Sequence, residues 1–250
     1  MIWHHVAPRL AERFSVVCPD LRGYGDSGTP ASDDRHEPYS KRVMAHDQLQ
    51  LMNTLGYECF ALAGHDRGAR VARRLALDHP DAVSRLAILD IVPTDTIYTT
   101  LSKEHATTVW RYFFLIQPPD LPERLIGSEP DFYLNWTFHE WCGTPGSLSH
   151  VALTEYRRCF DPATVHATCE DYRAGATIDL EHDRAGTRRL GCPLLVLWSE
   201  TGIGSAYDVL ATWSAEADDV RGRAFGCGHF LAEERPDQVA IELETFLTRV

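Results

Sequence analysis

The fold is decided by the stretch Ala63-Gly64-His65-Asp66-Arg67-Gly68-Ala69-Arg70. A short apolar run, Cys59 to Ala63, precedes it, and an amphipathic helical pattern from Arg70 to His79 follows it. A strand, a tight Gly-x-x-x-Gly turn and a helix predict a nucleophile elbow, in which the central side chain projects from a sharp turn. Here the central side chain is the carboxylate of Asp66. A carboxylate nucleophile favours attack on a saturated carbon, which forms an alkyl ester that water then cleaves.

The composition narrows the class of protein and its partners. The 250 residues fit one domain with an insertion, and 44% of them are hydrophobic and 24% charged. The formal net charge of −12 argues against nucleic acid or an anionic membrane as a partner, but a small anionic substrate stays compatible with a local pocket field. Seven scattered cysteines without metal-ligand spacing are typical of reduced thiols. No run approaches the ~20 apolar residues of a membrane span, and no signal-peptide pattern opens the chain. We therefore expect a cytoplasmic protein.

Short strands alternate with helices along most of the chain. Runs of strand length occur at Phe14–Cys18, Cys59–Ala63, Arg85–Ile91, Leu194–Trp198 and Arg221–Phe225. Helical patterns cover Ile2–Arg13, Val43–Leu55, Arg70–His79, Tyr207–Ala217 and Pro236–Val250. This alternation predicts an α/β fold with a mostly parallel, doubly wound sheet.

The pattern changes between Pro93 and about Leu190, where the chain is helical in character, rich in aromatic residues and interrupted by prolines. We interpret this stretch as a helical cap inserted after the strand that ends near Asp90. The predicted core then comprises residues 1–93 and 190–250, and the cap comprises residues 94–189.

Hydrolysis through an alkyl ester requires a carboxylate nucleophile, an imidazole that activates water and a second acid that orients the imidazole. Asp66 is the candidate nucleophile, although an aspartate after a strand often only caps a turn or helix. His229, in Gly226-Cys227-Gly228-His229-Phe230, lies between the last strand and the final helix, where ligand chemistry collects in such sheets. A lone histidine is usually structural, but the glycine-rich setting favours a catalytic base.

Two positions compete for the role of the orienting acid. Asp90 ends one predicted strand, whereas Asp208, with Glu200 nearby, follows the next strand after the cap. The residues alone leave this choice open. His65, next to the nucleophile, is expected to be a packing residue.

Arg67 and Arg70 follow the nucleophile and are three residues apart, so they share one face of the first helical turn. Cations at a helix N-terminus oppose the macrodipole, and their presence calls for a partner. We favour a substrate carboxylate, which two guanidinium groups can hold bidentately with its α-carbon in line with Asp66. The alternative is a structural ion pair with the surplus acids, which is also our interpretation of Arg73 and Arg74.

Together these motifs resemble the fluoroacetate dehalogenases, cap-bearing α/β-hydrolases that replace the halogen of a 2-halo acid by hydroxyl. The resemblance crosses nearly the whole chain through Asp20–Ser27, Gly64–Arg70, Leu89–Thr94, Phe113–Pro118, Glu170–Ala176 and Cys227–Phe230. The arginine-bearing elbow and the Asp-Tyr-Arg-Ala-Gly sequence are its most specific parts. The resemblance implies an α/β-hydrolase fold with Asp66 as nucleophile, His229 as base and Asp90 as acid partner. Arg67 and Arg70 would hold the substrate carboxylate.

The resemblance is weaker at the halide site, where family members use a tyrosine and a His-Trp pair of the cap. The tyrosine corresponds to Tyr172, whereas the pair falls on Arg111 and Tyr112, and neither residue matches. Fluoride leaves poorly and requires close, strong donors in a dry site. The resemblance therefore implies the reaction class but not defluorination, and a larger halide or a bulkier 2-halo acid is the expected substrate.

Relatives in that family begin with further strands and a His-Gly-Phe-Pro type turn, which lends an N–H to the oxyanion hole. This chain starts at Met1-Ile2-Trp3-His4-His5, which resembles the helix after that turn. We therefore expect an N-terminally truncated chain that lacks the first strands, one of which would lie between Phe14–Cys18 and Cys59–Ala63.

Two other functions stay open. An epoxide hydrolase uses the same Asp–His machinery with cap tyrosines, for which Tyr112 and Tyr172 are available, but it has no use for paired arginines. A non-catalytic, truncated member is the third interpretation. No metal or organic cofactor is implied, since water and the side chains complete the chemistry. The expected partner is a small anionic substrate, and the sequence leaves a homodimer open.

Overall fold

One parallel sheet organises the chain, which the computed structural model describes over residues 1–99, 102–186 and 189–248. The strands follow the order β1-β2-β3-β4, and every neighbouring pair is parallel. They are β1 (Phe60–His65), β2 (Val83–Leu89), β3 (Leu194–Ser199) and β4 (Val220–Phe225). Four of the five predicted strands are thereby confirmed, as is the α/β fold class.

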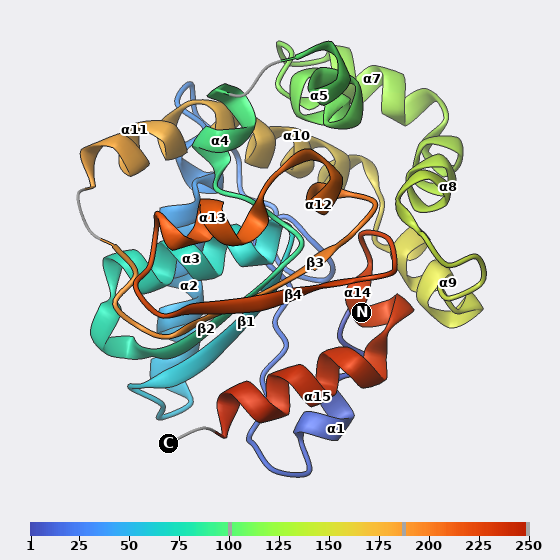
Figure 1. The fold of residues 1–250 in the computed structure, drawn as a ribbon. Helices are drawn as coiled ribbons and strands as arrows, with labels where there is room; N and C mark the ends of the chain where they lie inside the picture. The colour runs from blue at the N-terminus through green and yellow to red at the C-terminus, as the bar shows by residue number, and fades with distance from the viewer. Residues whose placement is uncertain (100–101, 187–188, 249–250) are drawn as a thin grey trace.

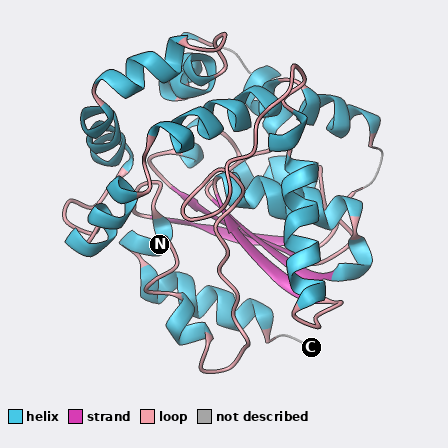
Figure 2. Ribbon diagram, turned by 180° about the vertical axis from the view of Figure 1, so that it is seen from behind, coloured by secondary structure: helices cyan, strands magenta, loops and turns pink. Residues whose placement is uncertain are grey.

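Helices cover both faces of the sheet (Figures 1 and 2). Successive side chains of a strand point to opposite faces, and β2 shows the result. Leu86 and Ile88 pack in one core with α2 (Lys41–Thr54), α3 (Arg67–Asp78) and α13 (Val209–Ser214). Ala87 and Leu89 pack in a second core with α1 (Ala7–Leu10) and α15 (Pro236–Leu247). The result is a three-layer α/β/α arrangement that fixes the carboxyl ends of the strands.

The prediction of a strand at Phe14–Cys18 is wrong. Residues 15–21 have no regular secondary structure, and Val16 and Val17 are each 37% exposed. A β-branched run becomes a strand only when a neighbouring backbone pairs with it, and no strand of the described residues lies beside this segment. The preceding helical pattern is reduced to turns around the short α1.

An all-helical segment is inserted between β2 and β3, as predicted. Its helices are α4 (Thr94–Thr99), α5 (Lys103–Thr108), α6 (Trp110–Leu115), α7 (Leu121–Ser128), α8 (Pro130–Trp141), α9 (His150–Arg158), α10 (Pro162–Ala176) and α11 (Ile178–Ala185). Helices α5 to α9 form an arch away from the sheet (Figure 1), and α10 contacts both this arch and η1 (Glu37–Tyr39). The cap boundaries 94–189 stay a prediction, and residues 100, 101, 187 and 188 of it lie outside the described residues.

Three short elements complete the core, namely η2 (Pro80–Ala82), α12 (Ile203–Ala206) and α14 (Leu231–Glu234). The final predicted helix is α15, and positions 249 and 250 of that prediction lie outside the described residues. Within the described residues, none of the helices has the length and apolar character needed to cross a membrane.

Candidate active site

Asp66 occupies the turn between β1 and α3, with φ +44° and ψ −115°. A non-glycine residue in this region is strained by about 1–3 kcal/mol. Gly64 makes the turn feasible, because a Cβ there would lie 2.6 Å from the Cα and N atoms of Ala69. The strand end, the strained residue and the helix start form the predicted elbow, which presents the Asp66 carboxylate at the carboxyl end of the sheet.

The structure brings Asp66, His229 and Asp90 together. His229 Nδ1 donates a hydrogen bond of 2.7 Å to Asp90 Oδ2, and His229 Nε2 lies 3.6 Å from Asp66 Oδ2. The backbone N–H of Ser199 donates to Asp90 Oδ1 at 2.7 Å and holds that carboxylate in place. Asp208 instead caps α13 by accepting from the N–H of Ala211. The geometry therefore favours Asp90 as the orienting acid.

The triad carries charge in the resting state. Burial opposes a charge on His229, but the hydrogen bonds and negative charges of Asp66 and Asp90 outweigh it and raise the pKa of His229 to about 10. Burial likewise opposes ionisation of Asp66, yet the contact with His229 holds the pKa of Asp66 well below its usual range. At neutral pH the site therefore holds an imidazolium between two carboxylates.

His65 packs against His229 and also contacts the backbone of its loop. Its ring centroid lies 4.5 Å from that of His229, and its Nε2 donates to the backbone carbonyl of His229 at 2.8 Å. Burial, followed by the nearby charge of His229, lowers the pKa of His65 to about 4. His65 is thus a neutral packing residue, as expected, with a hydrogen bond that the sequence did not reveal.

Arg67 is held in a buried ion pair. Its Nε and Nη2 donate to both oxygens of Asp171, at 2.7 and 2.8 Å. Asp171 also accepts from Lys41 Nζ and, at 2.6 Å, from the Tyr24 hydroxyl. Only Nη1 of Arg67 makes no hydrogen bond to the described part of the chain. The structure therefore contains the ion pair of the alternative interpretation, and the substrate role of Arg67 stays a prediction that depends on Nη1.

Arg70 keeps an uncompensated charge. It is 4% exposed, and its hydrogen bonds go to neutral groups, the Thr94 hydroxyl at 2.6 Å, the Val92 carbonyl at 3.2 Å and the Tyr112 hydroxyl at 2.8 Å. Its Nε has no acceptor, and within residues 1–99, 102–186 and 189–248 it pairs with no carboxylate. A buried cation without an anion is costly, so the surroundings of Arg70 among the described residues favour an anionic ligand.

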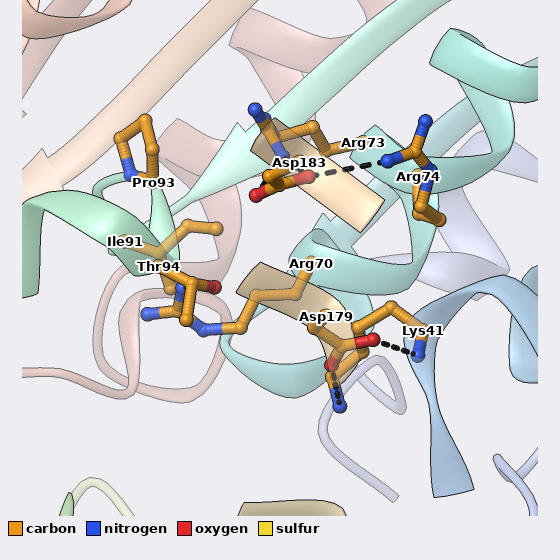
Figure 3. Close-up of a pocket in the computed structure, with 9 residues that line it drawn as sticks. All are labelled: Lys41, Arg70, Arg73, Arg74, Ile91, Pro93, Thr94, Asp179 and Asp183. Carbon is orange, nitrogen blue, oxygen red and sulfur yellow. Dashed lines mark hydrogen bonds and ion pairs between the residues drawn. The ribbon is translucent and has the colours of Figure 1, made fainter. Parts of the chain in front are cut away.

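Figure 3 shows why the nearby acids do not neutralise Arg70. Asp179 is paired with Lys41 Nζ at 3.3 Å, and Asp183 is paired with Arg73 and Arg74 at 3.0 and 3.1 Å. The ion pairs of Arg73 and Arg74 agree with their expected structural role. These side chains and Arg70 line a cavity of about 10 Å³, which is room for roughly one water molecule.

The predicted halide ligands lie in two different environments. Tyr172 and Tyr112 contact each other at 5.2 Å between ring centroids, and the Arg67 guanidinium lies 4.2 Å from the Tyr172 ring. Burial, and then the charge of Asp66, raises the pKa of Tyr172 well above its usual value, so its hydroxyl stays a donor. Arg111 instead lies in an aromatic cage.

The cage consists of four rings at 4.2–5.7 Å from the Arg111 guanidinium, those of Trp110, Tyr133, Trp136 and Trp141. Arg111 is 3% exposed and donates to the Thr137 hydroxyl at 2.8 Å, while its Nε has no partner. Burial lowers the pKa of Arg111. Within the described residues, Arg111 thus has cation–π contacts and no ion pair.

The comparison with known families places the chain. The family model described as alpha/beta hydrolase fold matches residues 1–236. The chain belongs to this family. Fluoroacetate dehalogenase from Burkholderia sp is 42% identical over 251 residues, which cover 99% of this hydrolase and 83% of the relative. The predicted resemblance is thereby confirmed.

A second relative and a solved structure are also similar to this hydrolase, and the relative is named for a different activity. Soluble epoxide hydrolase from Corynebacterium sp. (strain C12) is 34% identical over 242 residues, 95% of this chain and 82% of the relative. A crystal structure assigned to the α/β-hydrolases, from Nostoc sp PCC 7120, superposes with a TM-score of 0.98 at 55% identity. That match covers 100% of this chain and 87% of the other. The elbow with Asp66 is therefore set in the framework of a hydrolase.

Two groups of side chains in the described residues have ligand atoms close enough to share a metal ion. The first group is His4, His5 and Glu233, and the second is Glu123, His166 and Glu170. Neither group includes a member of the triad. In the second group, Arg173 already pairs with both glutamates, at 2.6 and 2.7 Å.

The raised pKa of His229 predicts how the stability of the hydrolase changes with pH. The usual histidine pKa is about 6.5, and the folded-state pKa of His229 is about 10. The resulting stabilisation is complete below about pH 6.5 and is lost as the pH rises toward 10. Denaturant unfolding at pH 6.5, 8 and 10 should show a fall in unfolding free energy on the order of a few kcal/mol. His229→Gln should remove most of this fall, and an equal fall in both proteins would contradict the charged triad.

Proposed function

We propose that this hydrolase removes the halogen from small 2-halo carboxylic acids, through an ester on Asp66, and releases the 2-hydroxy acid and the halide. The observation that carries the proposal is Arg70, which is buried one helical turn after the nucleophile with only neutral partners among the described residues. A substrate carboxylate compensates this charge. The 42% identity to fluoroacetate dehalogenase supports the same reaction class.

In the first step, the substrate carboxylate binds Arg70, with Nη1 of Arg67 as a second donor. A carboxylate oxygen of Asp66 attacks the α-carbon from the side opposite the halogen. The new C–O bond forms as the carbon–halogen bond breaks, and the halide leaves with the bonding electron pair. The protonated Tyr172 hydroxyl, whose pKa is raised by burial and by Asp66, serves as a donor to the halide.

The second step begins with a change in charge at His229. The ester of Asp66 is neutral, so one of the two carboxylates that raise the pKa of His229 is lost. The pKa of His229 then falls, and the imidazolium releases its proton to solvent. The neutral imidazole takes a proton from the water that attacks the ester carbonyl, while Asp90 stabilises the imidazolium that forms again. The base thus becomes available only after the ester exists.

Collapse of the tetrahedral intermediate completes the cycle. The backbone N–H of Arg67, directly after the nucleophile, donates to the oxyanion in this proposal. Cleavage of the ester C–O bond at the carbonyl carbon releases an alkoxide, which takes the proton of the His229 imidazolium and leaves as the 2-hydroxy acid. The Asp66 carboxyl then gives its proton to His229, which restores the carboxylate and the imidazolium. The net reaction consumes one water and yields one halide and one proton.

Halide release from fluoroacetate, chloroacetate and 2-chloropropionate tests the proposal. Ion chromatography should detect stoichiometric halide and 2-hydroxy acid from at least one of them. If none of the three compounds releases halide, the proposed function is wrong. Diol formation from a neutral epoxide in the same preparation would then favour the epoxide hydrolase alternative, which would use Tyr112 and Tyr172, whose rings contact each other.

The halide site predicts a preference for chloroacetate over fluoroacetate. Arg111 is enclosed by aromatic rings and donates to Thr137, so it does not supply the close donor that fluoride needs. Tyr112, whose hydroxyl accepts from Arg70 and keeps its own O–H, stands where the family has a tryptophan. The double variant Arg111→His/Tyr112→Trp restores the pair that the family uses. We expect it to raise the rate ratio of fluoroacetate to chloroacetate by about 10-fold or more, since one donor is worth on the order of 100-fold. An unchanged ratio would show that these positions do not select the halide.

A further inference from the structure

The end of helix α8 touches the loop that carries His229. The backbone N–H of His229 donates to the carbonyl of Trp141, the last residue of α8, at 2.7 Å. The indole ring of Trp141 also lies 4.9 Å from the imidazole ring. A segment of the inserted helices therefore bonds directly to the residue that the proposed mechanism uses as base.

Two glycines make this approach close. A Cβ added to Gly143 would lie 2.4 Å from the backbone N of Gly228, and one added to Gly228 would lie 2.2 Å from the N of Gly143 and the O of Trp141. Neither glycine has a positive φ, so the requirement comes from space and not from backbone conformation. The two backbones pack against each other with no side chain between them.

The side chain of Arg235 connects the same two segments. Arg235 Nη1 donates to the Thr144 hydroxyl at 3.0 Å, and Arg235 Nη2 donates to the Gly226 carbonyl at 2.7 Å. Residues 141–144 thus contact the His229 loop through a hydrogen bond at His229, close backbone packing at Gly228 and the Arg235 side chain, which also bonds to Gly226. We use the name clasp for residues 141–144.

We propose that the clasp, through Gly143, positions His229 for hydrolysis of the ester. The inference rests on the function proposed above. His229 must stay within 2.7 Å of Asp90 and point its other nitrogen at Asp66, and a shift of Gly228 moves the adjacent imidazole. Attack of Asp66 on the substrate does not need the imidazole as a base, whereas attack of water does. Disturbing the clasp therefore slows the second step selectively.

The test compares Gly143→Ala with Gly127→Ala in rapid-quench reactions with chloroacetate. Gly127 lies in α7, and a Cβ there would meet no atom within 4 Å, so Gly127→Ala is a matched control. Intact mass reports the ester, and chloride reports its formation. In Gly143→Ala we expect a chloride burst of one enzyme equivalent, an accumulated ester and ester hydrolysis slowed by about 10- to 100-fold. Gly127→Ala should behave like the wild type.

Three results would overturn the positioning role. The first is a rate of ester hydrolysis in Gly143→Ala that equals the wild-type rate. The second is an equal slowing of ester formation and ester hydrolysis. The third is a wild-type pH profile of ester hydrolysis in a variant whose melting temperature is lowered. If Gly143→Ala does not fold, the same reaction is measured with Thr144→Val, which removes only the hydroxyl that accepts from Arg235. A smaller but detectable accumulation of ester in Thr144→Val supports the positioning role. No accumulation of ester overturns it. A wild type that yields neither ester nor chloride overturns the proposed function itself, and the clasp with it.

Discussion

Asp66→Asn is expected to abolish halide release from chloroacetate, with a loss of at least about four orders of magnitude. An amide is not a nucleophile, and the near-identical shape keeps the strained elbow and its contacts. The substitution also removes one of the two negative charges beside His229. We therefore expect the pKa of His229 to fall from about 10 toward its usual value, which an NMR titration of the imidazole would measure.

Asp208→Asn is the matched control for this experiment. Asp208 caps α13, and asparagine is an equally good helix cap, so activity and stability should not change. Turnover by Asp66→Asn within about 10-fold of the wild type would exclude Asp66 as the nucleophile. An unchanged pKa of His229 would contradict the proposal that ester formation frees the base.

Arg70→Leu should lower kcat/KM for chloroacetate by about 100- to 1000-fold, because removing one partner of a buried charge pair costs about 2–5 kcal/mol. Chloroacetamide is the neutral comparison, and its reaction should change much less. Steady-state chloride release from both compounds gives the measurement. An equal loss for the two compounds would show that Arg70 does not recognise the carboxylate.

Arg67→Leu provides the contrast that separates the two arginines. Asp171 is fully buried, and its ion pair with Arg67 is part of the structure before any substrate binds. We therefore expect Arg67→Leu to lower the unfolding free energy by about 3 kcal/mol, whereas Arg70→Leu should leave it nearly unchanged or raise it. The reverse order of stabilities would contradict the division of roles between Arg67 and Arg70.

The parts of the site that were predictable are encoded locally. Gly64, Asp66 and Gly68 lie within one turn, and the apolar run before them and the helical pattern after them are adjacent in sequence, so the elbow follows from short-range rules. His229 was marked by its glycine-rich setting after the last strand. These signals do not depend on how distant segments meet.

The parts that were missed depend on distant contacts. Asp171 lies 104 residues from Arg67 in the sequence. Neither periodicity nor spacing indicates that these two residues form a buried ion pair. The residues alone did not separate Asp90 from Asp208, so the choice of Asp90 came from the resemblance, and the contact of Asp90 with His229 became visible only in the fold. Phe14–Cys18 has strand propensity but no pairing partner in the described residues, since β propensity is expressed only in a sheet.

The most direct test of the account is the covalent state of the His229→Ala variant after exposure to chloroacetate. Without the base, the ester should form and persist, so intact mass spectrometry should show a gain of one carboxymethyl group. Peptide mapping should place that group on Asp66. A variant that stays unmodified while the wild type turns over, or a modification on any other residue, would contradict Asp66 as the nucleophile.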